Sequence, residues 1–224
     1  MREKDSLLQS NGLLLCVCGP SGAGKGTLIS GLLENIPNLF LSISQTTREP
    51  RLGEKHGEHY YFCSREEFER QLEAGEILEY DEYLDNYYGT PAPPIREQLA
   101  SGKNVVLDIT IAGGFRVKEL FPEAAVLVFV IPENLEVLRN RLTGRGTEPA
   151  HIIEQRLQQA VQELDNVEKF DYLLINDVLE NSLARFRSIL LAESCKVRRQ
   201  KQAISELKVD FAQMEQRATQ NLSE

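Results

Sequence analysis

The sequence predicts an α/β fold in which a parallel sheet is flanked by helices on both of its faces. Four apolar runs, at 13–18, 105–109, 125–131 and 172–176, have the length and composition of strands buried on both sides. Segments with helical periodicity stand between these runs, and such alternation is typical of a doubly wound sheet. With 224 residues the chain can form one sizeable core, so we expect one compact unit with small insertions.

The composition is that of an ordinary globular protein and narrows the range of partners. Hydrophobic residues make up 42% of the chain and charged residues 26%, and the formal net charge is −9. This negative charge argues against nonspecific binding to nucleic acid or to an anionic membrane surface. No apolar run approaches the ~20 residues of a spanning helix, and the N-terminus lacks a signal-peptide pattern, so we expect a cytoplasmic protein.

The cysteines, Cys16, Cys18, Cys63 and Cys195, are few and irregularly spaced. Cys16 and Cys18 lie two positions apart and therefore share one face of the first predicted strand. A metal or redox pair is one interpretation of them. Buried, reduced thiols in a cytosolic protein are the simpler interpretation.

A glycine-rich loop follows the first apolar run directly. The segment Gly19-Pro-Ser-Gly-Ala-Gly-Lys25-Gly26-Thr27 keeps phosphate-loop spacing, and an apolar helix follows it. Glycines let backbone amides approach phosphate oxygens, the helix N-terminus adds partial positive charge, and Lys25 can reach the β- and γ-phosphates. Gly26 stands where a Ser or Thr usually places a hydroxyl on Mg²⁺. The loop predicts a nucleoside triphosphate site, against the alternative of an ordinary glycine-rich turn.

Two further groups of charged residues indicate phosphoryl transfer. Asp108 ends an apolar run, where a carboxylate can hold Mg²⁺ or its water shell, although an Asp that merely begins a turn is the plainer alternative. Arginines on two predicted helices and the loop between them can neutralise a transferring phosphoryl group, or can form a solvated helix face. These arginines are Arg139, Arg141, Arg145 and Arg156.

We predict that residues 44–98 form a small insertion of mixed strands and helices, rich in polar and aromatic side chains. Arginines and tyrosine hydroxyls suit a phosphate, and a carboxylate can accept two N–H bonds from the N1/N2 edge of guanine. The candidates are Ser44, Arg48, Arg51, Glu54, Tyr60, Glu79, Tyr88 and Thr90. Sequence spacing alone does not bring them together, and each one taken alone is more often a surface residue.

Six segments of the chain resemble the guanylate kinase family, in the family's order, over about residues 13–195. The segments are Gly19-Pro-Ser-Gly-Ala-Gly-Lys25, Thr46-Thr-Arg48-Glu-Pro-Arg51-Leu-Gly-Glu54, Gly57-Glu-His-Tyr60-Tyr-Phe62, Asn86-Tyr-Tyr88-Gly89-Thr90, Leu142-Thr-Gly-Arg145-Gly-Thr147 and Asp171-Tyr-Leu-Leu-Ile-Asn176. The second and fourth are far more specific than the phosphate loop, which many nucleotide enzymes share. The tail near 196–202 also resembles bacterial members.

The resemblance implies the fold of a P-loop nucleoside monophosphate kinase and Mg²⁺-dependent transfer of the ATP γ-phosphoryl group to GMP, giving ADP and GDP. It also implies a division of the chain. The parts are a core of about 13–43, 99–138 and 168–195, a GMP-binding insertion at 44–98, a lid at 139–167 and a helical tail at 196–224.

Site residues follow from the resemblance position by position. The ATP-binding positions are Gly19, Pro20, Ser21, Gly22, Ala23, Gly24, Lys25, Gly26, Thr27 and Asn176. The GMP-binding positions are Ser44, Arg48, Arg51, Glu54, Tyr60, Glu79, Tyr88, Gly89, Thr90 and Asp108, with Glu79 on the guanine edge and Glu54 supporting the arginines. The catalytic positions are Lys25, Arg48, Arg141, Arg145 and Arg156, and Asp108 holds the metal through water.

Two departures from the family pattern bear on these expectations. Family members commonly have Leu-Asp-Ile-Asp-x-Gln-Gly at the end of the central strand, where this chain has Leu107-Asp-Ile-Thr110-Ile-Ala112-Gly113. The missing second Asp normally approaches GMP, which puts acceptor affinity or base selectivity in question. Gly26 replaces the usual Ser, as in adenylate kinases, and suggests that Mg²⁺ is held largely through water and phosphate oxygens.

Two other functions compete with an active guanylate kinase. Guanylate-kinase-like binding modules in scaffold proteins keep the GMP pocket but lose the phosphate loop and lid arginines, whereas Lys25, Arg141 and Arg145 are present here. A related kinase with another acceptor, such as a ribose bisphosphate, fits Thr110 and Ala112 but not the retained guanine-edge residues.

The tail from Cys195 to Glu224 mixes basic residues with an apolar set, Val197, Ile204, Leu207, Phe211 and Met214. Such a pattern predicts an amphipathic helix. Two interpretations stay open: a homo-oligomer formed through this helix, or a helix that packs on its own core.

Overall fold

Five parallel strands form the central sheet of the computed structural model, which describes residues 12–83, 85–144 and 150–221. The strands are β1 (Leu14–Cys18), β2 (Leu39–Leu41), β7 (Asn104–Asp108), β8 (Ala125–Pro132) and β9 (Tyr172–Asn176), in the order β2-β7-β1-β8-β9. The parallel sheet predicted from the apolar runs is confirmed. β2 is short because the chain leaves this sheet after Ser42 to enter a second one.

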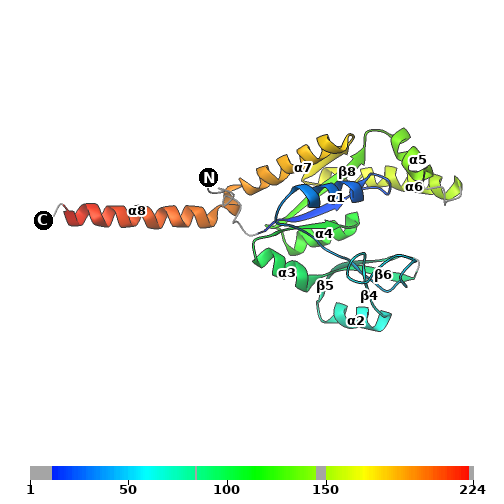
Figure 1. Ribbon diagram of the computed structural model, residues 1–224, viewed down its shortest axis with the longest axis horizontal. Helices are drawn as coiled ribbons and strands as arrows, with labels where there is room; N and C mark the ends of the chain where they lie inside the picture. The colour runs from blue at the N-terminus through cyan, green and yellow to red at the C-terminus, as the bar shows by residue number, and fades with distance from the viewer. Residues whose placement is uncertain (1–11, 84, 145–149, 222–224) are drawn as a thin grey trace.

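Helices cover both faces of this sheet (Figure 1). α1 (Lys25–Asn35) and α7 (Leu179–Ser194) pack against one side chain row of β1, which includes Leu15 and Val17. α3 (Ala92–Ala100) and α4 (Ile111–Leu120) pack against the opposite row, which includes Cys16 and Cys18. Both thiols are buried and free of any disulfide, and burial raises the pKa of Cys18 to about 12.

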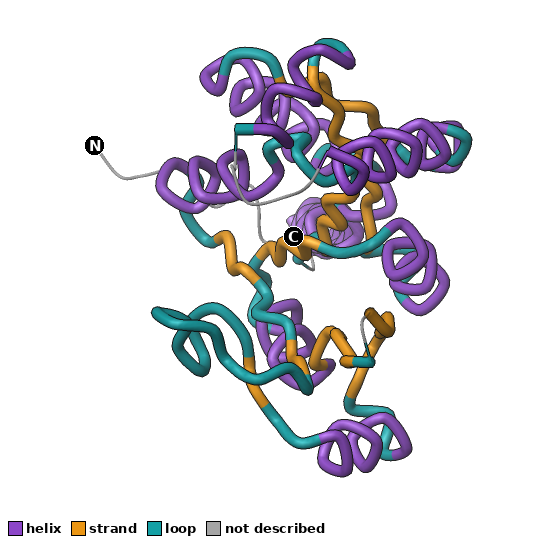
Figure 2. The backbone as a smooth tube through the Cα atoms, turned by 90° about the vertical axis from the view of Figure 1, so that its right-hand side faces the viewer, coloured by secondary structure: helices purple, strands orange, loops and turns teal. Residues whose placement is uncertain are grey.

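A smaller mixed sheet lies beside the central one (Figure 2). Its strands are β3 (Gln45–Thr46), β4 (Tyr61–Phe62), β5 (Ile77–Tyr83) and β6 (Asn86–Pro91), in the order β4-β3-β6-β5, with α2 (Arg65–Glu73) packed on β6. β5 also contacts α4 of the main body. Residues of the second sheet and of the segments at the carboxyl ends of β1 and β7 line one cavity.

Beyond β8 the chain forms a helical pair, α5 (Leu135–Thr143) and α6 (Ala150–Leu164), followed by the short η2 (Val167–Lys169). Leu138 and Leu142 of α5 pack against Leu157 and Ala160 of α6. Arg145 lies outside the described residues.

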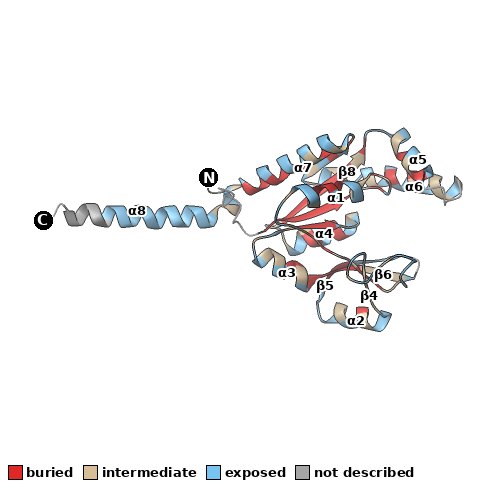
Figure 3. Ribbon diagram, viewed as in Figure 1, coloured by how far each residue is buried: buried red, intermediate tan, exposed pale blue. Residues whose placement is uncertain are grey.

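The tail consists of η3 (Val197–Arg199) and α8 (Lys201–Asn221). α8 projects away from the body, and its described side chains, 201–215, are all exposed (Figure 3). Packing of the tail helix on its own core, one of the two interpretations of the sequence, is therefore not what the structure shows.

Candidate functional site

The glycine-rich loop links β1 to α1 in the arrangement that its sequence predicts. Gly19, Gly22 and Gly24 have φ angles of 135°, 88° and 88°, a region that strains side-chain-bearing residues. A Cβ at Gly24 would lie 2.4 Å from Nδ2 of Asn176, so this position also needs glycine for space. Nζ of Lys25 donates to the carbonyl oxygen of Gly19 at 2.6 Å, which places the ammonium over the loop.

Asp108 lies beside this loop because β7 and β1 are neighbouring parallel strands whose carboxyl ends coincide, with Val17 opposite Asp108. Its Oδ1 is 4.0 Å from Nζ of Lys25. Desolvation within the cleft raises the pKa of Asp108, and the Lys25 charge opposes that shift. A carboxylate and an ammonium thus meet at one end of the phosphate loop.

Glu54 holds two arginines of the second sheet's loop in place. Both of its carboxylate oxygens accept from Nη2 of Arg48 at 2.9 Å, and one accepts from the backbone N–H of Arg51 at 2.8 Å. The Arg51 amide and the Arg48 guanidinium hold the pKa of Glu54 below its usual range. The Arg48 guanidinium carbon also lies 5.6 Å from the ring centroid of Tyr60. These contacts preorganise positive charge at the mouth of the cleft.

Glu79 of β5 is buried at the back of the same cleft, only 8% exposed. Oγ1 of Thr90 donates a short hydrogen bond to one of its oxygens. The other oxygen faces the first turn of α4, where a Cβ on Gly113 would lie 2.4 Å from it. Burial raises the pKa of Glu79, and the Thr90 hydrogen bond opposes the shift. The carboxylate is held in one orientation, with its acceptor oxygens available to a ligand that carries paired N–H groups.

A second group of contacts lies on the other side of the loop. Nη1 of Arg141 and Nδ2 of Asn176 both donate to the carbonyl oxygen of Ala23, at 3.1 and 2.8 Å. Nη2 of Arg141 also approaches the carbonyl oxygen of Asn176 at 3.4 Å. A cavity of about 420 Å³ opens here, lined by Gly22, Gly24, Thr27, Arg141, Asn176, Asp177 and Leu179.

The phosphate loop and the predicted acceptor residues line one larger cavity of about 1060 Å³. Of the predicted site residues it is lined by Gly19, Ser21, Lys25, Ser44, Arg48, Arg51, Glu54, Tyr60, Glu79, Tyr88, Gly89 and Asp108. Thr90 takes part through Glu79, while Pro20, Ala23 and Gly26 line neither cavity. Arg156 sits on α6 and is not among the residues that line these two cavities, and its catalytic role stays a prediction. The acceptor residues, dispersed in the sequence, do converge.

Several residues that line the larger cavity were not among the site residues predicted from the sequence. Asp81 and Tyr83 line the cavity because they follow Glu79 at alternate positions along β5, a signal that strand periodicity carries. Thr110 also lines it, and its hydroxyl accepts from the Gly113 amide at 3.1 Å as the N-cap of α4. Ile109 and three residues of α4, Ile111, Ala112 and Phe115, line it as well. The others come from α6 and the segment after it: Gln159, Gln162, Glu163, Asn166 and Lys169.

The described residues offer few protein ligands for a metal. Within residues 12–83, 85–144 and 150–221, no three His, Cys, Asp or Glu side chains are grouped so as to hold an ion. Asp108 is the carboxylate that stands beside the phosphate loop. A divalent ion here would take most of its ligands from phosphate oxygens and water, which suits Mg²⁺. In the same described ranges, no helix has the length and apolar character needed to cross a bilayer.

Comparisons with a family model, with curated relatives and with solved structures all point to the same family. The model of the family described as guanylate kinase matches residues 11–193. The chain is 46% identical over 191 residues to guanylate kinase of Desulfitobacterium hafniense, covering 85% of this chain and 95% of that protein. It is 47% identical over 179 residues to guanylate kinase of Synechocystis sp., covering 80% and 93%. The crystal structure of guanylate kinase from Anaplasma phagocytophilum superposes with a TM-score of 0.70 at 36% identity, covering 86% and 91%.

Proposed function

The chain belongs to the guanylate kinase family, and from this premise we propose how its residues transfer the γ-phosphoryl group of ATP to GMP, giving ADP and GDP. The activity is that of an ATP:GMP phosphotransferase. One observation carries the assignment of roles: a single cavity is lined both by the phosphate loop with Lys25 and by the acceptor residues around Arg48 and Glu79. Donor and acceptor phosphates can therefore meet in it.

The donor half binds ATP along the loop. The phosphates lie at the N-terminus of α1, surrounded by the loop of Gly19, Pro20, Ser21, Gly22, Ala23, Gly24, Lys25, Gly26 and Thr27, in which every residue except Pro20 has a backbone N–H to donate. Asn176 lies beside the adenine, in the smaller cavity behind the loop. Lys25 now donates to the Gly19 carbonyl, and it transfers that hydrogen bond to a β- or γ-phosphate oxygen when ATP binds.

The acceptor half binds GMP. Glu79 accepts from N1–H and N2–H of guanine, and Thr90 keeps its carboxylate oriented. Arginine guanidinium and tyrosine or serine hydroxyl groups hold the GMP phosphate, with Glu54 fixing the arginine geometry. The residues in this half are Ser44, Arg48, Arg51, Glu54, Tyr60, Glu79, Tyr88, Gly89 and Asp108, which line the cavity, and Thr90, which acts through Glu79.

Transfer itself needs no covalent intermediate, because the acceptor oxygen attacks in line with the leaving group. Lys25, Arg48 and Arg141 supply positive charge around the transferring group, and we assign the same task to Arg145 and Arg156 of the lid. Mg²⁺ entering with ATP would supply charge neutralisation at the phosphates. Asp108 would hold the ion through its water shell, since Gly26 offers no hydroxyl at the usual position.

We assign three parts to the reaction cycle: a core (13–43, 99–138 and 168–195), a GMP-binding insertion (44–98) and a lid (139–167). Closure of the insertion and lid over the cavity would exclude water, whose attack on ATP competes with transfer to GMP.

The assignment is tested by acceptor specificity. A coupled assay of ADP release with ATP and Mg²⁺ should give turnover with GMP far above that with AMP, CMP or UMP. Equal rates with all four acceptors would contradict the guanine-edge role of Glu79. Absence of ATP binding in calorimetry would favour a binding module instead, and turnover confined to another phosphorylated acceptor would favour the related-kinase alternative.

We propose in addition a cytoplasmic location and a homo-oligomer formed through residues 196–224. Buried Cys16 and Cys18, free of any disulfide, suit a reducing compartment. The net charge of −9 disfavours nucleic acid as a partner. The exposure of α8 supports self-association through the tail.

A further inference from the structure

One face of α6 borders the larger cavity and brings to it a carboxylate to which no role has been assigned. The residues of this face are Gln159, Gln162, Glu163 and Asn166. They recur at the three- and four-residue spacing that places side chains on one side of a helix. Residues on another side of α6, among them Leu157 and Ala160, pack against α5 and fix how the helix is turned. The Glu163 side chain therefore belongs to the wall of the cavity.

The Glu163 carboxylate is half-buried and only half satisfied. Its Oε1 accepts from Nε2 of Gln159 at 3.1 Å. Its Oε2 is buried and has no hydrogen-bond partner among the residues that the structure describes. Lys169, a cation in the same wall, donates instead to Oδ1 of Asn166 at 3.1 Å and lies 5.6 Å from the ring centroid of Phe115. Burying a carboxylate oxygen in this way is unfavourable for the fold.

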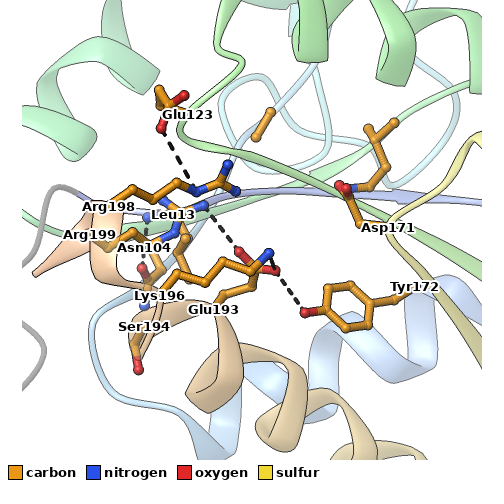
Figure 4. Close-up of polar contacts among 12 residues, drawn as sticks. Leu13, Asn104, Glu123, Asp171, Tyr172, Glu193, Ser194, Lys196, Arg198 and Arg199 are labelled. Atoms are coloured by element: carbon orange, nitrogen blue, oxygen red, sulfur yellow. Dashed lines mark hydrogen bonds and ion pairs between the residues drawn. The ribbon is translucent and has the colours of Figure 1, made fainter.

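Another buried carboxylate shows how this chain compensates such a group elsewhere (Figure 4). The Glu193 carboxylate, at the end of α7, accepts from Oη of Tyr172 at 2.8 Å, Nζ of Lys196 at 2.5 Å and Nη2 of Arg199 at 3.3 Å. The side chains of Glu193 and Arg199 are 1% and 5% exposed. Two cations and a hydroxyl thus offset its desolvation. Glu163 has no comparable set of partners in the described part of the chain, which indicates that its charge serves the cavity rather than the fold.

Glu163 and Asp108 act on the same cation, the Lys25 ammonium. Oδ1 of Asp108 is 4.0 Å from Nζ of Lys25. Desolvation raises the pKa of Glu163, and the charge of Lys25 and the Gln159 hydrogen bond oppose that shift. Burial is the main cause of the raised pKa of the Cys18 thiol, at the end of β1, and both carboxylates add to it. The start of the phosphate loop thus lies in the field of two carboxylates, one from β7 and one from α6.

We propose that Glu163, together with Asp108, makes the donor site select ATP complexed with a divalent metal over metal-free ATP. The inference rests on the proposed binding of ATP along the phosphate loop. Metal-free triphosphate is highly anionic, and when it engages Lys25 the two carboxylates are left facing like charge, which is repulsive. A divalent ion that enters with ATP would lower the charge of the nucleotide, and carboxylates suit the water shell of such an ion. The same two side chains therefore disfavour one form of ATP and favour the other.

Calorimetry of ATP binding tests this selectivity, with excess EDTA in one series and excess Mg²⁺ in the other, at pH 8, which favours the ionised carboxylate. The parent should bind ATP more tightly with Mg²⁺ than with EDTA. Glu163→Gln keeps the size of the side chain and removes its charge, so the Kd for metal-free ATP should fall about fivefold or more. The Kd for ATP with Mg²⁺ should stay the same or rise, so the preference for the metal complex shrinks. Glu163→Asp keeps the charge and should retain the preference of the parent to within about threefold.

Glu154→Gln is the matched control, because it removes the same charge from a position of α6 that is 59% exposed. It should leave the preference for the metal complex within about twofold of the parent. The inference is overturned if the parent binds both forms equally, if Glu163→Gln keeps the preference of the parent or binds metal-free ATP more weakly, or if the control changes as much. Absence of binding of either form to the parent would instead contradict the ATP site itself, so the two failures are distinguishable.

Discussion

Replacement of Glu79 by Gln isolates the charge that we assign to guanine recognition. The amide keeps the shape of the side chain, and Thr90 can still donate to its oxygen. The oxygen that faces Gly113 becomes, in one of the two amide orientations, an NH₂ group that can only donate. A ligand with paired N–H groups then loses one charge-assisted hydrogen bond and meets a donor in its place.

The expected size of the effect follows from that loss. A hydrogen bond to a charged group contributes roughly 1.5–3 kcal/mol, and a buried donor left facing a donor adds about 1–3 kcal/mol. We therefore expect kcat/KM for GMP to fall by ~10²-fold or more. The KM for ATP at saturating GMP should change by less than about threefold, because the phosphate loop does not contact Glu79.

Thermal stability, unlike activity toward GMP, should not fall in Glu79→Gln. Burial raises the folded-state pKa of Glu79 above that of the unfolded chain, so this group contributes most to the stability of the fold at low pH, where its carboxyl is protonated and neutral. That contribution is lost as pH rises through the raised pKa. Glutamine carries no charge to desolvate, so the variant should melt at the same or a higher temperature than the parent at pH 7. The same raised pKa predicts that the KM for GMP increases as the pH falls toward it, since only the carboxylate accepts both N–H groups.

Steady-state kinetics with each substrate varied, together with thermal melts, measure all of these quantities. A variant that melts several degrees lower, or that loses efficiency toward ATP and GMP equally, would show that Glu79 is a structural residue.

Three further substitutions probe the loop and the wall of the cleft. Lys25→Ala should lower turnover by ~10²-fold or more with little change in melting temperature, and near-parent turnover would remove Lys25 from the mechanism. Gly113→Ala should raise the KM for GMP about tenfold or more and leave the KM for ATP unchanged, since its Cβ would lie 2.4 Å from a Glu79 oxygen. A KM for GMP equal to that of the parent would show that β5 and α4 shift to accommodate the methyl group. Gly26→Ser meets no atom within 4 Å and should fold normally with a lower half-saturating Mg²⁺ concentration, whereas an unchanged Mg²⁺ titration would show that the hydroxyl is dispensable.

The core of the fold could be predicted because its signals are local. Each buried parallel strand is a continuous apolar run, and the phosphate loop is one uninterrupted segment after β1. The contact between Glu79 and Gly113 could not be predicted, because it depends on how β5 packs against α4. Thr110 appeared in the sequence only as a departure from the family, whereas in the structure it caps α4.

The tail shows another limit of sequence patterns. The spacing of Ile204, Leu207, Phe211 and Met214 predicts an apolar face but is the same whether the helix packs on its own core or on another chain. Only the direction in which α8 leaves the body distinguishes the two cases.

The buried cluster at Glu193 determines where this protein can be shortened. A chain cut at residue 195 would retain the whole matched family region, 11–193, yet it would lose Lys196 and Arg199 and leave the Glu193 carboxylate with Tyr172. Removing the partners of a buried charge costs about 3–5 kcal/mol, a large part of the stability of an ordinary domain. A chain ending after Gln200 keeps both cations. The end of the catalytic region in sequence and the end of the unit that folds are thus several residues apart.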